Sequence, residues 1–111
     1  IDLESLCRAV GIKRVQGVDP YDMETCTKVI KEELAANEPS VIISRRPCAL
    51  LKYVKHPGPI CSDPEKCKGC KACMGIGCPA ISMEGGKAVI DATLCVGCGV
   101  CTQLCKFNAL G

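Results

Sequence analysis

The chain has 111 residues, a net charge of +2 and 12 cysteines, with two Tyr, one Phe and no Trp. This length allows one ordinary domain or two small ones, and so few large side chains build only a modest core. The small net charge gives no case for nucleic-acid binding, and no stretch of 18 apolar residues is present to span a membrane.

Residues 1–50 have the composition of an α/β segment. Apolar residues at helical spacing predict a helix that stops at Gly11, and a strand is expected over 12–18. Asp19 and Pro20 are expected to be the N-cap and first residue of an amphipathic helix over 20–36. Val41, Ile42 and Ile43 then form an apolar run typical of a buried strand, so this order fits a parallel sheet.

Two short strands and two helices cannot bury themselves, and Ile1 lies inside a helical pattern. We therefore expect residues 1–50 to be the C-terminal fragment of a larger α/β domain. The alternative is a small extension that packs on the rest of the chain.

Residues 51–60 contain Pro57, Gly58 and Pro59 and are expected to be a linker. The remaining residues, 61–111, are expected to form a separate domain. Within it, residues 81–91 predict a β-hairpin with a glycine turn, and a short helical turn is expected after the last cysteine of each repeat described next.

Eight cysteines form two repeats in the C-terminal half. The first repeat has the spacing Cys-x2-Cys-x2-Cys-x4-Cys-Pro and the second Cys-x2-Cys-x2-Cys-x3-Cys. This is close to the run of bacterial ferredoxins, in which three cysteines of a repeat bind one [4Fe–4S] cluster and the fourth binds the other. We expect one cluster on Cys67, Cys70, Cys73 and Cys105, and a second on Cys95, Cys98, Cys101 and Cys78.

Residues around these cysteines fit two clusters and single-electron transfer. Glycines allow tight turns whose N–H groups can approach sulfur, and apolar residues can limit solvent; we expect these to be Gly69, Gly97, Gly99, Val96, Val100, Ile76, Ile81 and Ile90. Two positions depart from the pattern. Gly75 or Gly77 must accommodate one extra residue, and Lys106 replaces the usual proline.

Other uses of the cysteines fit less well. Zinc sites usually have two separated Cys-x2-Cys pairs, and a [3Fe–4S] cluster would leave one ligand position unused. A disulfide scaffold requires an oxidising compartment, whereas Asp2, Glu4 and Arg8 interrupt the N-terminal apolar run that a signal peptide needs. We therefore expect a reducing, cytoplasmic location.

Four cysteines and one histidine lie outside the two sets. Cys7 and Cys26 are on apolar helix faces and are expected to be small buried hydrophobes. Cys61 could replace a ligand only by a change of register. Cys48 follows the last strand, where a packed thiol or a redox role next to a substrate are both open. His56 is expected to be exposed to solvent.

The segment 39–50, with its Arg-Arg-Pro-Cys motif, and the two cysteine repeats resemble the C-terminal end of the large subunit of indolepyruvate:ferredoxin oxidoreductase. Residues 17–22 resemble the preceding turn of that subunit's thiamine-diphosphate domain. The resemblance implies an α+β chain: a fragment from the end of a thiamine-diphosphate-binding-type domain, followed by a dicluster ferredoxin-like domain with a pseudo-twofold repeat.

Members of that family decarboxylate aryl 2-oxoacids oxidatively to acyl-CoA and CO2 and pass the electrons to external ferredoxin. The resemblance implies that this chain is the redox module, and that thiamine diphosphate and Mg²⁺ bind only the upstream part of the parent enzyme. The remaining part or a second subunit of that oxidoreductase is then a partner of this chain. No Gly-Asp-Gly-type motif for them is present, so we assign no catalytic residue. The alternative is a free-standing ferredoxin-like carrier or docking module without an enzymatic activity of its own.

Overall fold

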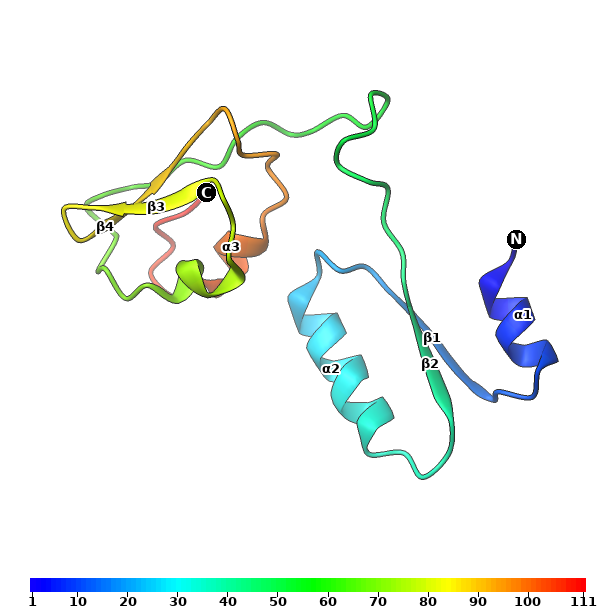
Figure 1. Cartoon of the computed structure of the whole chain (residues 1–111). Helices are drawn as coiled ribbons and strands as arrows, with labels where there is room; N and C mark the ends of the chain where they lie inside the picture. The colour runs from blue at the N-terminus through cyan, green and yellow to red at the C-terminus, as the bar shows by residue number, and fades with distance from the viewer. The chain divides into compact units, whose positions relative to one another are not determined.

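A computed structural model describes all 111 residues as two compact units, Ile1–Pro47 and Cys48–Gly111 (Figure 1). We describe each unit by itself. The assignment of residues 1–50, 51–60 and 61–111 to a fragment, a linker and a domain stays a prediction, although residues 51–60 contain no helix or strand. No helix has both the length and the apolar character needed to cross a bilayer.

The N-terminal unit alternates helices and strands, as predicted. Its two strands pair in parallel with a register that runs from Arg14 opposite Ser40 to Val18 opposite Ser44. Parallel strands need a crossover, and a helix supplies it here. The elements in chain order are α1 (Leu3–Ala9), β1 (Arg14–Val18), α2 (Met23–Leu34) and β2 (Ser40–Ser44).

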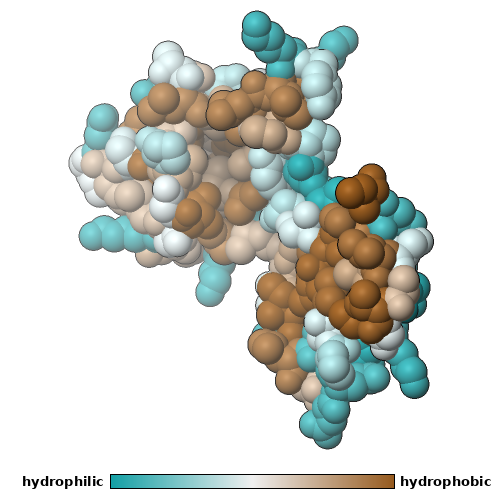
Figure 2. All heavy atoms as spheres, turned by 45° about the vertical axis from the view of Figure 1, so that its right-hand side comes forward, coloured by the Kyte–Doolittle hydropathy of each residue, from teal (hydrophilic) through white to brown (hydrophobic).

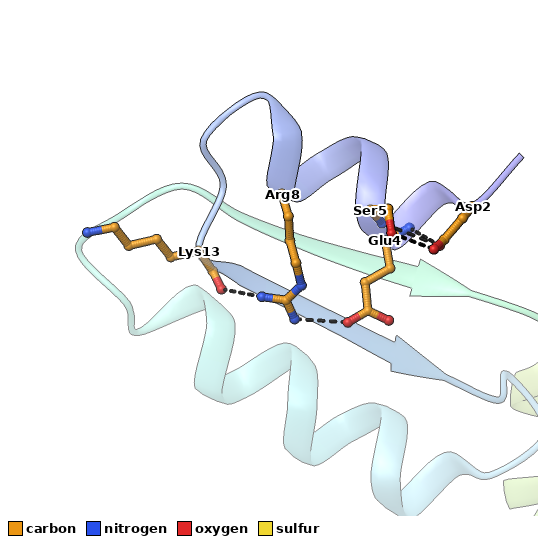
Figure 3. Close-up of polar contacts among 5 residues, drawn as sticks. All are labelled: Asp2, Glu4, Ser5, Arg8 and Lys13. Atoms are coloured by element: carbon orange, nitrogen blue, oxygen red, sulfur yellow. Dashed lines mark hydrogen bonds and ion pairs between the residues drawn. The ribbon is translucent and has the colours of Figure 1, made fainter.

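Helix α1 is closed at both ends by local polar contacts (Figure 3). The Asp2 carboxylate accepts hydrogen bonds from the backbone N–H groups of Glu4 and Ser5, at 3.1 and 3.3 Å. Arg8 pairs with Glu4 at 2.9 Å, four residues earlier on the same face. Gly11 follows the helix with φ +94°, which confirms the predicted glycine stop.

Helix α2 begins later than the sequence predicts, and the predicted cap at Asp19 is wrong. Asp22 is the N-cap, because its carboxylate accepts a hydrogen bond from the Thr25 N–H at 3.1 Å and from the Thr25 hydroxyl at 2.7 Å. Asp19 instead closes the preceding turn, where it accepts a hydrogen bond from the Tyr21 N–H at 2.9 Å. Pro20 therefore lies in that turn and not in the helix.

The N-terminal unit has little apolar interior. Only Val15 and Val18 are buried hydrophobic residues there, and the buried residue of α2 is a carboxylate, Glu33. Arg14 of β1 meets Glu33 with two hydrogen bonds, at 2.9 and 3.0 Å, which matches the fork geometry of a guanidinium. Much of the apolar surface of this unit stays open to solvent, as the brown atoms around α1 show in Figure 2.

The C-terminal unit consists of short elements joined by tight loops: η1 (Ala72–Ile76), β3 (Ile81–Glu84), β4 (Lys87–Ile90) and α3 (Val100–Leu104). Strands β3 and β4 form an antiparallel hairpin, as predicted. Gly85 and Gly86 form its two-residue turn with φ values of +55° and +76°, a conformation that glycine adopts without strain.

A second antiparallel contact joins the beginning and end of the cysteine-bearing segment. Cys61 and Gly111 exchange two backbone hydrogen bonds of 3.0 Å, and the Asp63 N–H donates to the Ala109 carbonyl at 2.7 Å. Ser62 pairs with Leu110 as an isolated bridge. Residues 61–63 and 109–111 therefore lie side by side.

The short helices of each repeat lie before its last cysteine, and single hydrogen-bonded turns at 79–80 and 106–107 follow it. Cys73 is inside η1 and Cys101 is inside α3, and both elements end before Cys78 and Cys105. The third cysteine of each repeat must approach the same pocket as the first two, and a helical turn brings it there. Gly77 follows η1 with φ +67° and accommodates the extra residue of the first repeat.

Candidate metal centres

The first predicted set of cysteines surrounds one pocket. Cys67, Cys70, Cys73 and Cys105 all line it, so residues 38 positions apart in the chain come together. Cys67 and Cys73 are buried, Cys105 is partly exposed and Cys70 is exposed. The remaining lining residues include Lys68, Lys71, Met83, Ala88, Phe107, Ala109 and Leu110.

The second predicted set surrounds another pocket in the same unit. Cys95, Cys98, Cys101 and Cys78 line it, again with three cysteines from one repeat and the fourth from the other. Four of the five apolar side chains predicted to enclose the sites line this pocket, and Val100 does not. Its other lining residues are Ile60, Ile76, Pro79, Ala80, Ile81, Ile90, Leu94, Val96 and Gly99.

The loops between the first two cysteines of each repeat share one conformation. Gly69 and Gly97 have φ values of +68° and +72°. A Cβ atom on Gly69 would overlap the Gly86 carbonyl oxygen, and one on Gly97 would overlap the Gly58 carbonyl oxygen. Each loop therefore requires glycine for its backbone conformation and also for its close contact with a neighbouring strand or loop.

Backbone N–H groups donate hydrogen bonds to three of the cysteine sulfurs. The Ala88 N–H lies 3.4 Å from Cys67 Sγ, the Ala109 N–H 3.3 Å from Cys105 Sγ, and the Ile60 N–H 3.3 Å from Cys95 Sγ. Such donors stabilise thiolates and tune the potential of a bound cluster. From the sequence only glycine donors are expected. These three donors come from the hairpin, from the C-terminal segment and from the end of residues 51–60, whose contacts with the cysteines the sequence does not display.

The cysteine pKa values follow from these contacts and from burial. The N–H groups of Ala88 and Gly69, with a smaller contribution from Lys87, lower the pKa of Cys67. Burial raises the pKa of Cys73 and of Cys101, and the neighbouring thiols of each set raise both further. Anionic sulfurs crowded in one place repel one another, and a cationic metal core between them removes that repulsion.

The donor sets fit iron–sulfur clusters. Four thiols are among the residues that line each pocket, and four thiolates are the ligand set of a [4Fe–4S] cube. No three His, Cys, Asp or Glu side chains surround a single-ion position.

Comparison with known proteins agrees with this donor chemistry. Residues 88–111, which include the second cysteine repeat, match the model of the 4Fe-4S binding domain. The chain is also 42% identical, over 96% of its length, to the indolepyruvate oxidoreductase subunit IorA of Pyrococcus horikoshii, and 42% identical, over 98%, to that of Thermococcus kodakarensis. The predicted resemblance to this subunit is confirmed. The chain spans 18% of the length of these IorA relatives.

A relative with another name is also similar to most of this chain. The dihydromethanopterin reductase (acceptor) of Methanosarcina mazei is 33% identical over 84% of the chain, which spans 44% of that protein.

The segments that carry the IorA resemblance contact one another within the N-terminal unit. Arg46 pairs with Asp19 at 2.6 Å, and its guanidinium lies 4.0 Å from the centre of the Tyr21 ring. Arg46 of the Arg-Arg-Pro-Cys motif therefore contacts the turn at 17–22, at the carboxyl ends of the two parallel strands.

Four cysteines of this IorA-like chain lie outside both pockets. Cys7 and Cys26 are partly exposed, and Cys26 Sγ donates to the Asp19 carbonyl at 3.0 Å. Cys61 and Cys48 are exposed. A crevice at the carboxyl ends of the strands is lined by Glu4, Gly17, Val18, Ile43 and Arg45, and Cys48 is not among its lining residues.

His56 is exposed and its Nε2 lies 2.8 Å from the Ala49 carbonyl oxygen. Lys106, which the sequence places next to Cys105, is exposed and does not line the first pocket. Lys87 contacts the backbone of this site, because its Nζ donates a hydrogen bond to the Cys67 carbonyl at 2.5 Å.

Proposed function

We propose that this chain transfers electrons through two [4Fe–4S] clusters, as the redox module of a thiamine-diphosphate-dependent 2-oxoacid:ferredoxin oxidoreductase of the indolepyruvate type. A [4Fe–4S] cluster takes up and gives off one electron at a time. One observation carries the proposal: the chain brings eight cysteines into two groups of four, each lining one pocket.

The proposed ligands are those expected from the sequence. Cys67, Cys70, Cys73 and Cys105 would hold the first cluster, and Cys95, Cys98, Cys101 and Cys78 the second. The shared loop conformation at Gly69 and Gly97 and the matching positions of η1 and α3 support a pseudo-twofold relation between the repeats. The 4Fe-4S domain match supports the second site most directly, because it includes three of that site's ligands.

The remaining parts of the proposed function rest on the IorA relatives. The N-terminal unit would be the end of a thiamine-diphosphate-type α/β domain, and its two parallel strands and sparse core support that assignment. The cofactor, its Mg²⁺ and the chemistry that yields acyl-CoA and CO2 would belong to other residues of the parent enzyme or to a second subunit. External ferredoxin would accept the electrons, in the cytoplasm.

Iron and sulfide analysis of protein purified anaerobically tests the cluster count. We expect about eight irons and eight sulfides per chain, and a reduced-state electron paramagnetic resonance signal of interacting clusters. Cys70→Ala should lower the iron to about four per chain. Cys61→Ala is the matched control, because Cys61 is equally exposed but lines neither pocket, and it should keep full iron. Full iron in Cys70→Ala would disprove the assignment.

A free-standing electron carrier is the second candidate. The relative named dihydromethanopterin reductase (acceptor) supports a module that serves more than one kind of enzyme, since the chain spans 44% of that protein, which has a different name. The discriminating measurement is reduction of the 111-residue protein by unrelated redox enzymes. Rapid reduction by several of them favours the carrier. Reduction only together with the rest of an IorA-type enzyme and its 2-oxoacid favours the redox module.

A further inference from the structure

The two cysteine pockets differ in the charge of the residues around them. Lys68 and Lys71 line the first pocket, and Lys87 contacts the backbone carbonyl of Cys67. No charged side chain lines the second pocket. One site therefore has a cationic border and the other an apolar one, although both have the same four-thiol donor set.

The border of the first pocket is open to solvent. Lys68 and Lys71 are exposed and neither forms an ion pair, whereas Lys66 pairs with Asp63 at 3.5 Å. Cys70, between the two unpaired lysines in sequence, is itself exposed. Phe107 lines the same pocket and is 43% exposed, so an apolar ring accompanies the two cations.

The two exposed lysines, Lys68 and Lys71, are not needed to neutralise the charge of the thiolates. The second pocket holds an equal number of thiols without any cation at its lining. At the first pocket, the half-buried Lys87 already lies against Cys67. Lys68 and Lys71 are free to interact with something outside the chain.

We propose that the face formed by Lys68, Lys71 and Phe107 is the docking surface for an acidic one-electron carrier protein, and that electrons leave through the first cysteine site. This inference rests on the proposed function. Cationic side chains around an apolar contact attract an acidic partner over a distance and orient it, while the aromatic ring is desolvated on contact. The oxidised carrier gains one electron, the cluster held by the first set of cysteines loses one, and no proton or bond is involved.

Binding of a small, strongly acidic ferredoxin in its oxidised form to the full iron-loaded chain tests this inference. Anaerobic calorimetry at several salt concentrations gives the affinity and its salt dependence. The Lys68→Gln/Lys71→Gln double variant should bind about tenfold more weakly at low salt, with a shallower salt dependence, because charges at an interface border act mainly by steering. The matched control, Lys28→Gln/Lys31→Gln, changes the net charge equally on α2 and should stay within about twofold of the parent chain.

Equal loss of affinity in both double variants, or no loss in either, would overturn the docking surface. If the Lys68→Gln/Lys71→Gln variant loses iron, the reciprocal experiment decides: a ferredoxin whose surface carboxylates are replaced by amides should bind the parent chain more weakly, and unchanged binding would disprove the proposal. Tighter binding of anionic lipid vesicles than of ferredoxin would also disprove it. A parent chain without iron refutes the proposed function, whereas an iron-loaded chain with unaffected binding refutes only the docking surface.

Discussion

The two units of this chain are stabilised by different interactions. In the N-terminal unit, strand pairing, helix caps and the Arg14–Glu33 pair hold the elements together around two buried valines. In the C-terminal unit, three cysteines, Cys67, Cys73 and Cys101, are part of the buried hydrophobic core. A unit with few large side chains can therefore be organised either by strand pairing and an ion pair or by buried cysteines whose proposed role is to bind metal.

Removal of iron should give the largest difference in stability between the two units. We expect anaerobic chelation to unfold the C-terminal unit, since its buried cysteines would be left as repelling or unligated sulfurs. Hydrogen exchange followed by mass spectrometry should then show loss of protection over β3 and β4, while the paired strands β1 and β2 keep theirs. Retained protection in the hairpin after complete iron loss would show that the C-terminal unit does not depend on iron for its fold.

The substitution Gly97→Ala, which adds one methyl group, should have the next largest effect, on the iron content of the chain. In Gly97→Ala the new Cβ would overlap the Gly58 carbonyl oxygen, at a residue whose φ is +72°. We expect loss of the second cluster, seen as a fall to about four irons per chain. The displaced loop carries two of the proposed ligands, Cys95 and Cys98.

Gly86→Ala is the matched control for this substitution. Gly86 has a similar φ of +76°, but a Cβ there meets nothing within 4 Å. The variant should keep its iron and lose about 1–2 kcal/mol of stability, the usual cost of a left-handed conformation for an L-residue. Equal iron loss in both variants would mean that backbone strain, and not the close contact, decides cluster retention.

The smallest expected effect is a pH-dependent loss of stability in the N-terminal unit when Glu33 is replaced by Gln. The hydrogen bonds from Arg14 lower the pKa of Glu33 from its ordinary value of 4.5. A lowered folded-state pKa means that the stabilisation is complete well above 4.5 and is lost as the pH falls through the folded value. The stability difference between the parent chain and Glu33→Gln should therefore be largest at neutral pH and shrink in acid.

Hydrogen exchange of α2, corrected for intrinsic rates, measures this difference. Glu32→Gln is the control, because Glu32 is exposed on the same helix and forms no ion pair. A stability difference for Glu33→Gln that stays constant between neutral and acid pH would show that the ion pair does not stabilise this unit.

Much of the fold follows from local sequence patterns. The helix–strand alternation, the Gly11 stop and the Gly85–Gly86 hairpin were predictable because each depends on neighbouring residues. The grouping of cysteines into two pockets also agrees with the expectation from their spacing. The cap of α2 was not predictable with certainty, because Asp19-Pro20 and Asp22 are competing start signals and the side-chain bonds of Thr25 decide between them.

Other features depend on contacts between distant residues. No local pattern reveals that Ile60 donates to Cys95, or that Ala109 and Leu110 return to pair with residues near Cys61. The role of Lys87 is similar: the sequence places Lys106 beside a cysteine, but hairpin pairing brings Lys87 to Cys67 instead. Long-range register decides such contacts, and spacing alone does not contain it.

The pairing of residues 61–63 with residues 109–111 has a consequence for how such a module is used in evolution. Because residues 61–63 lie beside residues 109–111, the two ends of this segment are close together, and a segment of this kind can be inserted into another polypeptide at one surface position. Insertion of this kind is compatible with the matches of the whole chain, which spans 18% of one oxidoreductase subunit and 44% of a different reductase.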